Sequence, residues 1–196
     1  MIDRLSEGIG RDSVSVVYLY YSFQAQKSQA PAHMLTSLLK QVVDGLEEIP
    51  VEINQAFQKA KKGSDGRGLS VSEILKLLPA ALMSQKRTFI CIDALDECAT
   101  EQQPEFLRSL HSIVRDSPNV RLFVTGRPHI QAGLEGQHGG ALQILRFKPL
   151  KEDIGKFLEM KLKDDLFREE MDSELRQDIL KLIPEMMSEM WVYYSR

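Results

Sequence analysis

Two groups of polar residues come directly after apolar runs that have the composition of buried strands. The groups are Asp93, Asp96 and Glu97 after residues 88–92, and Thr125 and Arg127 at the end of residues 120–125. Carboxylates are oxygen ligands that Mg²⁺ takes in nucleotide sites, and a nearby arginine can stabilise charge that develops on a transferred phosphate. Three carboxylates this close in sequence repel one another unless a cation or a basic side chain compensates. The pattern therefore indicates a magnesium site that faces nucleotide phosphates.

Each side chain has a role in this hypothesis and a simpler alternative. Asp93 would hold the metal, Asp96 and Glu97 would orient or deprotonate the attacking water, and Thr125 and Arg127 would contact the nucleotide, with the arginine stabilising the phosphate charge. The alternatives are a solvated acidic turn that caps the next helix, an ordinary loop arginine and a strand-end hydroxyl. A phosphatase of the haloacid dehalogenase type is disfavoured, because its two aspartates are separated by one residue, whereas two residues separate Asp93 and Asp96.

The hydrophobic pattern predicts the strands and helices that would position these residues. Buried strands are expected at residues 14–21, 88–92, 120–125 and 141–147, and helices at 31–46, 51–61, 70–78 and 104–116. A glycine-rich loop is expected at residues 133–140, and only helices from Lys151 onward. Alternating strands and helices imply βαβ crossovers, so the expected fold is α/β, with a three-layer, mostly parallel sheet and an all-helical C-terminal tail. Ligands of such sheets bind at the carboxyl ends of the strands, where both polar groups would lie.

Composition and charge exclude several classes of function. The chain has 196 residues, of which 43% are hydrophobic and 27% charged, as in folded globular domains. Its net charge is −3 and its basic residues are scattered, so nucleic acid is not an expected partner. The apolar run at residues 14–21 is too short to span a bilayer and no secretory signal is present, so neither a membrane nor secretion is expected and the predicted location is cytoplasmic. Cys91 and Cys98 are expected to be buried or partly buried free thiols.

Four segments of the sequence resemble those of a known family. Residues 89–98 and 121–128 resemble the Walker B and sensor segments of fungal NACHT proteins, close to the nephrocystin-3-like N-terminal domains that precede ankyrin or other repeats. Residues 14–21 and 35–41 resemble the segments that these proteins place between the phosphate loop and the Walker B strand. The similarity covers about residues 1–185. The resemblance therefore implies a P-loop NTPase of the signalling STAND class.

The family binds Mg²⁺ with ATP or GTP and uses the nucleotide as a switch that drives self-association. By the same resemblance Asp93 is the magnesium residue, Asp96 and Glu97 are the second acidic pair, and Arg127 is the sensor. The expected partners are further copies of the chain or intact NACHT-type proteins. Whether this chain holds the cofactors itself depends on a phosphate loop.

No stretch of the sequence matches the phosphate-loop pattern of spaced glycines followed by Lys-Ser or Lys-Thr. The nearest stretch, residues 63–70, has the glycine spacing but places Leu69 where the lysine belongs. Residues 1–5 align with the end of the helix that follows the loop in the family, so the resemblance predicts truncation before the loop and after the NTPase core. The expected organisation is a partial NACHT-like core at 1–148 and a helical tail at 149–196.

Two functions follow from these expectations. The first is a fragment of a NACHT-type signalling NTPase that carries the Walker B and sensor segments and cannot bind or hydrolyse ATP or GTP alone. The second is a non-catalytic interaction module that associates with intact family members, which an exposed strand edge at the position of the missing first strand would favour.

Overall fold

The computed structural model describes residues 14–62, 68–138, 142–147, 150–164, 172–186 and 190–195. Its strands are β1 (Val14–Tyr20), β2 (Arg87–Asp93), β3 (Val120–Gly126), β4 (Leu142–Phe147) and β5 (Met190–Ser195). Its α-helices are α2 (Pro31–Asp44), α3 (Val51–Lys62), α4 (Val71–Met83), α5 (Gln103–Asp116), α6 (Gln131–His138), α7 (Lys151–Asp164) and α8 (Ser173–Met186). Three short 3₁₀ helices follow the parallel strands: η1 (Phe23–Ser28), η2 (Leu95–Glu97) and η3 (Pro128–Ile130).

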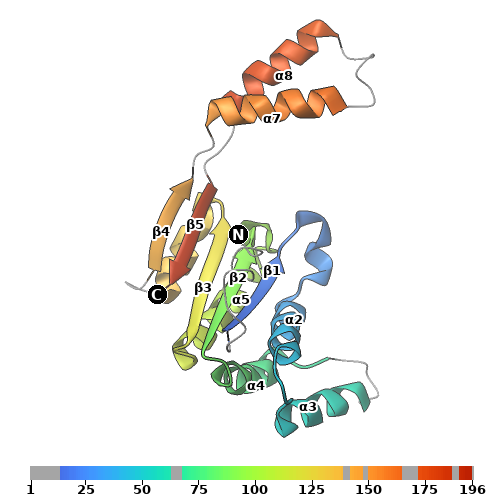
Figure 1. Ribbon diagram of the computed structural model, residues 1–196, viewed down its shortest axis with the longest axis vertical. Coiled ribbons are helices and arrows are strands. Elements are labelled where there is room, and N and C mark those ends of the chain that lie inside the picture. Colours follow the sequence, from blue (N-terminus) through green and yellow to red (C-terminus); the bar gives the residue numbers. More distant parts are fainter. Residues whose placement is uncertain are drawn as a thin grey trace.

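The strands form one sheet in the order β1-β2-β3-β5-β4 (Figure 1). β1, β2 and β3 are parallel neighbours, so their carboxyl ends lie at the same edge of the sheet. β5 runs antiparallel to both β3 and β4. The predicted α/β class and the parallel arrangement of the first three strands are therefore confirmed.

Local sequence accounts for the helices that cover this sheet. Pro31 occupies the first turn of α2, where its missing N–H costs nothing, and the apolar residues at helical spacing behind it are buried. Ser70 and Glu73 form the predicted capping box of α4, in which Glu73 Oε2 accepts the Ser70 N–H at 2.9 Å. These helices bring their apolar faces to the sheet.

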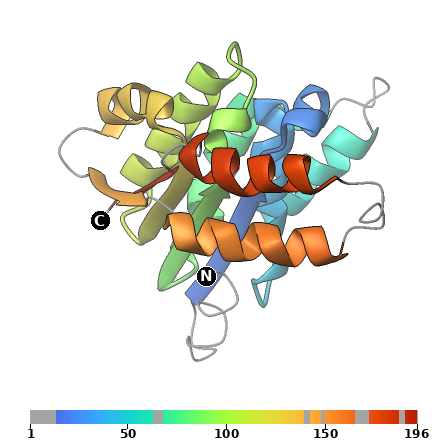
Figure 2. The ribbon, with the colours of Figure 1, turned by 90° about the horizontal axis from the view of Figure 1, so that it is seen from above.

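The helices that pack on the sheet lie on one of its faces. α2, α4, α5 and α6 form a continuous layer, as the view in Figure 2 shows. Val17 and Leu19 of β1 are buried beneath this layer, whereas Tyr18 and Tyr20, which point to the other face, are 43% and 53% exposed. The described part of the chain thus has two layers, and the predicted three-layer arrangement is wrong there.

The outer edge of β1 is covered by glutamine side chains. The Gln41 side chain accepts the Tyr18 N–H at 2.9 Å and donates to the Tyr18 carbonyl at 2.8 Å, and Gln29 donates to the Tyr20 carbonyl at 2.8 Å. These amides take the place of a neighbouring strand, which protects the edge from pairing with another chain.

Two predictions for the second half of the chain are wrong. Gly133 and Gly136 lie in α6 instead of a loop, because Leu134 is fully buried and the helix packs against α5. Gly139 and Gly140 lie outside the described residues. The predicted tail is not all-helical, since its last described segment is β5, which enters the sheet between β3 and β4. The boundary predicted after residue 148 stays a prediction. Among the described helices, none is both long and apolar enough to cross a bilayer.

Candidate functional site

The predicted polar residues meet at the carboxyl ends of β2 and β3. Asp93 is the last residue of β2, and its exposed carboxylate accepts a hydrogen bond at Oδ1 from the Thr125 hydroxyl of β3. The same hydroxyl accepts the Ala94 N–H at 2.9 Å. Thr125 therefore uses its donor and acceptor capacity together and fixes the orientation of the Asp93 side chain.

A sharp turn follows Asp93 and redirects the acidic segment. Ala94 has φ 54° and ψ 45° and is the one non-glycine residue with positive φ in the described ranges. This left-handed conformation costs an L-residue roughly 1–2 kcal/mol. The fully buried Leu95 and the Ala94–Thr125 hydrogen bond hold the turn in place. The turn carries Asp96 towards the end of β3.

Asp96 lies against Arg127 and Gly126. Its Oδ2 is 3.4 Å from Arg127 Nε, and its side chain is only 9% exposed, whereas that of Arg127 is 65% exposed. A Cβ at Gly126 would lie 3.2 Å from Asp96 Oδ1 and 2.5 Å from Ile130 Cδ1, so a larger residue would force the end of the Ile130 side chain to shift. The ion pair anchors the arginine and leaves most of its side chain accessible at the carboxyl-end edge.

Glu97 is engaged in a different direction. Its Oε2 accepts the Phe23 N–H at 2.8 Å, and its backbone carbonyl accepts the Gln26 side-chain amide at 2.8 Å. Glu97 thus ties η2 to η1, the segment that follows β1. This contact explains how three acids close in sequence coexist: each has its own donor or cationic partner.

The three carboxylates do not form a closed metal cage. Among the residues whose positions are described, no three His, Cys, Asp or Glu side chains converge in a way that could hold a metal ion. Mg²⁺ in nucleotide sites keeps several waters and is bound through one or two carboxylates plus substrate phosphates. The exposed Asp93 carboxylate fits that open type of site, in which phosphate oxygens supply the remaining ligands.

The cysteines do not take part in this chemistry. Cys91 and Cys98 are both buried free thiols, which confirms the prediction. Burial raises the pKa of the Cys91 thiol to about 11, and it also raises the pKa of Cys98. Burial likewise raises the pKa of Tyr21, whose ring packs edge-on against Phe106 with centroids 5.4 Å apart. These buried groups therefore remain protonated at neutral pH.

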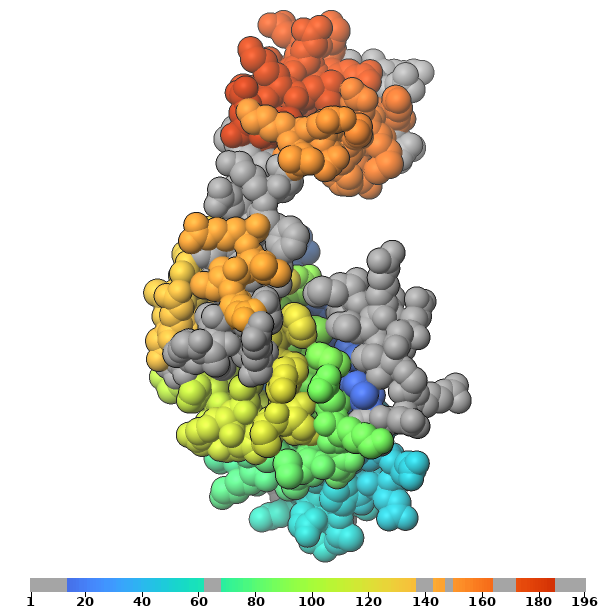
Figure 3. Space-filling model, turned by 60° about the vertical axis from the view of Figure 1, so that its left-hand side comes forward, coloured from blue at the N-terminus to red at the C-terminus, as the bar shows by residue number. Residues whose placement is uncertain are grey.

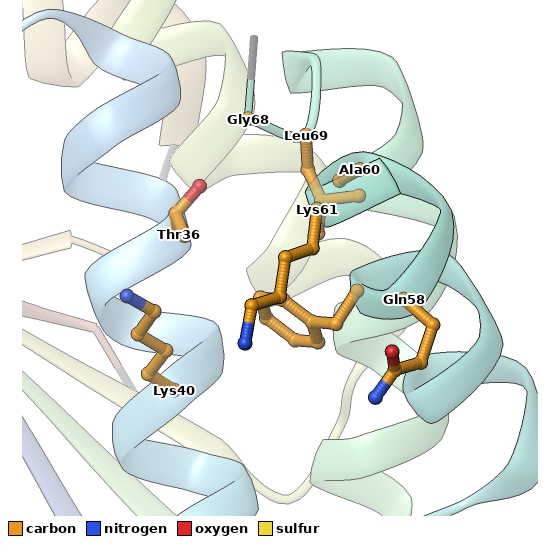
Figure 4. A pocket seen from close by; sticks show the side chains of 8 residues that line it. Thr36, Lys40, Gln58, Ala60, Lys61, Gly68 and Leu69 are labelled. Carbon is orange, nitrogen blue, oxygen red and sulfur yellow. The ribbon is translucent and has the colours of Figure 1, made fainter. Parts of the chain in front are cut away.

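A separate cavity lies between α2 and α3, away from this cluster (Figure 4). Its volume is about 360 Å³, and the side chains of Lys40 and Lys61 reach into it beside Thr36. The Thr36 hydroxyl donates to the Ala32 carbonyl at 2.7 Å. Of the predicted phosphate-loop decoy, residues 63–67 lie outside the described residues and Leu69 lines this cavity. None of the predicted site residues does so.

All five residues of the cluster were predicted from the sequence, but Gly126 and Ala94, which bring them together, were not. The structure brings Asp93 to Thr125 and Asp96 to Arg127, while Glu97 turns towards η1. The roles assigned to these five side chains remain predictions. Gly126 was missed, although a glycine between the strand-end threonine and the arginine was a visible signal. The turn at Ala94 carries no sequence signal, because alanine rarely adopts positive φ.

The comparison with protein families gave one match. The family model described as Nephrocystin 3, N-terminal, matches residues 1–127. The match spans β1 to β3 and ends at the arginine of the cluster. No curated protein matches the sequence at a significant level.

Proposed function

Since the chain belongs to the nephrocystin 3 N-terminal family, we propose that residues 14–127 are the magnesium and sensor side of a NACHT-like, P-loop-type nucleotide switch. In this proposal the end of β2 is a Walker B element and the end of β3 carries the sensor. Asp93 would hold Mg²⁺, and Arg127 would contact the phosphates of the nucleotide. Asp96 positions the arginine through its ion pair.

The observation that carries the proposal is the pairing of the two strand ends. An acid at the tip of β2 is hydrogen-bonded to the Thr125 hydroxyl of the neighbouring parallel strand, and the arginine two residues further is paired with Asp96. Phosphates that bind at this edge of the sheet would therefore meet a guanidinium that Asp96 already anchors. Preorganised charge of this kind is what stabilises a transferring phosphate.

The phosphates themselves need a second element. Backbone N–H groups of a glycine-rich loop and a lysine normally surround them, and the sequence has no such pattern. We infer that a phosphate loop outside this sequence supplies this element, and that the 196 residues alone neither bind nor hydrolyse ATP or GTP. When bound, the ion supplies charge neutralisation between the two elements.

Equilibrium dialysis against labelled ATP and GTP with Mg²⁺ tests this proposal. The wild type is compared with Asp93→Asn, which keeps the hydrogen-bond acceptor for Thr125 but removes the charge. We expect both to retain nucleotide only at background level. Strong retention that Asp93→Asn abolishes would overturn the inference that the chain is inactive alone. Strong retention that Asp93→Asn leaves unchanged would contradict the assignment of the site.

A non-catalytic interaction module is the second candidate. The exposed strand edge expected to favour it is not found in the described sheet, because β5 lies beside β3 and glutamines cover β1. The open aromatic face favours it instead: Tyr18 and Tyr20 are exposed there, with ring centroids 5.5 Å apart. A pull-down with an intact family member tests it, with Tyr20→Ser expected to weaken recovery. Recovery of nothing by the wild type would rule it out.

A further inference from the structure

The strand β5 lies inside the sheet, between β3 and β4. β3 and β4 run in the same direction and are joined through α6, yet they are not neighbours: a gap the width of one strand separates them. β5 fills this gap in the opposite direction. In mixed sheets of this kind the antiparallel strand usually lies at the edge, whereas here it lies inside. The gap between β3 and β4, which we call the β5 slot, is thus filled by a remote segment.

The slot requires a strand. Without one, β3 and β4 would each present a row of unpaired N–H and carbonyl groups. β5 pairs with β3 from Phe123–Tyr194 to Gly126–Trp191, and with β4 along the whole strand from Leu142–Ser195 to Phe147–Met190. Its sequence is rich in aromatic and β-branched residues, which favour strands. Any copy of this strand meets the same requirement.

The helices that carry β5 hold it only loosely to the rest of the molecule. α7 and α8 pack against each other, and no other described element packs against either to a similar extent. Figures 1 and 3 show this hairpin standing off the sheet. We call α7, α8 and β5 together the arm. The arm is therefore secured to the body mainly through its strand.

The hairpin of the arm also exposes apolar side chains. Phe157 and Met160 of α7 are 54% and 50% exposed, and Leu175 and Leu182 of α8 are 50% and 48% exposed, whereas Ile154 is buried. In a pair of helices, each helix buries only the side that faces its partner, so apolar side chains on its other sides stay exposed. A second identical hairpin would cover these side chains in the manner of a four-helix bundle.

We propose that two copies of the chain exchange their arms, so that β5 of each copy enters the β5 slot of the other. The exchanged strands make the same backbone hydrogen bonds as in the single chain, so the pairing in the slot needs no new complementarity. The gain comes from the apolar side chains of the two hairpins, which a single chain leaves in water. This inference does not depend on the proposed nucleotide site.

Cysteines placed across the slot distinguish exchange from a closed monomer. Leu145 of β4 and Val192 of β5 are register partners, and they lie on the body and on the arm. Leu145→Cys and Val192→Cys are made as separate variants, refolded together from urea and oxidised. Ser195→Cys replaces Val192→Cys in the matched control, because Ser195 pairs with Leu142 and is out of register with residue 145.

Exchange predicts a disulfide-linked heterodimer of twice 22.3 kDa from the in-register mixture, and none from the out-of-register mixture or from either variant alone. The double variant, Leu145→Cys with Val192→Cys, shows whether β5 lies in the slot at all. A mixture that stays monomeric while the double variant closes a bond within one chain would overturn the proposal. A double variant that forms no bond in either way would overturn it as well, because β5 would then not occupy the slot.

Discussion

Replacing Gly126 by alanine should destabilise the protein by an amount that the packing of Ile130 against this position sets. The added Cβ would lie 2.5 Å from Ile130 Cδ1 and 3.2 Å from Asp96 Oδ1. Carbon atoms in contact normally lie about 3.5–4.0 Å apart, so the Ile130 side chain or the backbone must move by about 1 Å. Ile130 is buried, but the clashing Cδ1 is the end of a rotatable side chain, so the cost should lie near the lower end of the usual range. Overpacking of this kind costs about 1–3 kcal/mol.

Thermal unfolding followed by circular dichroism measures this cost. For a domain of this size about 1–3 kcal/mol lowers Tm by roughly 2–12 °C. Gly136→Ala is the matched control: a Cβ there meets nothing within 4 Å and the residue lies inside α6. We expect this control to keep or raise the stability, by up to about 1 kcal/mol. Equal Tm values for the two variants would refute the packing argument.

Three further substitutions test individual contacts. Thr125→Val should lower the free energy of unfolding by about 1 kcal/mol, because it leaves the Ala94 N–H unpaired, whereas Thr125→Ser keeps the hydroxyl and should leave it unchanged. Equal free energies of unfolding for the two variants in a urea titration would speak against this. Tyr21→Ala should lower the free energy of unfolding by about 3–5 kcal/mol, because it leaves a cavity beside Phe106, whereas Tyr21→Phe keeps the ring contact and should cost less; equal losses in a urea titration would contradict this. Because the pKa of Cys91 is raised, the folded state keeps the thiol proton at a pH where the unfolded state loses it. The free energy of unfolding should therefore keep its full value below about pH 9 and fall towards pH 11. Urea titrations across this range should show a smaller fall for Cys91→Ala, and an unchanged slope would contradict this.

The first half of the fold could be predicted because its signals are local. The apolar runs of β2 and β3 end in polar residues, and Ser70 and Glu73 mark a helix start. The positions of Asp93 and Arg127 at one edge followed from parallel pairing alone. The second half depends on contacts that local patterns do not contain. Two glycines in α6 and the distant pairing of β5 are examples.

The contacts inside the cluster could not be predicted for a related reason. The register between β2 and β3 decides that Thr125 meets Asp93, and a shift by one residue would turn the hydroxyl to the other face. The position of η1 after β1 brings the Phe23 N–H within hydrogen-bond distance of Glu97. The sequence therefore indicated which residues gather at the sheet edge, and the three-dimensional arrangement decided which of them remain available for a metal.

Binding of a divalent cation tests directly whether Asp93 is a metal ligand. Mn²⁺, which prefers the same oxygen ligands as Mg²⁺, is titrated into the protein while free Mn²⁺ is measured by electron paramagnetic resonance. Asp44→Asn is the control of equal charge, since Asp44 ends α2 beside Gly45, near Ser15 at the opposite edge of the sheet. We expect Asp93→Asn to weaken Mn²⁺ binding and Asp44→Asn to leave it unchanged, because Asp93 carries the one carboxylate of the cluster that is paired with neither a cation nor a backbone N–H. Equal Mn²⁺ affinity in the wild type and Asp93→Asn would contradict the assignment of Asp93 as the metal ligand.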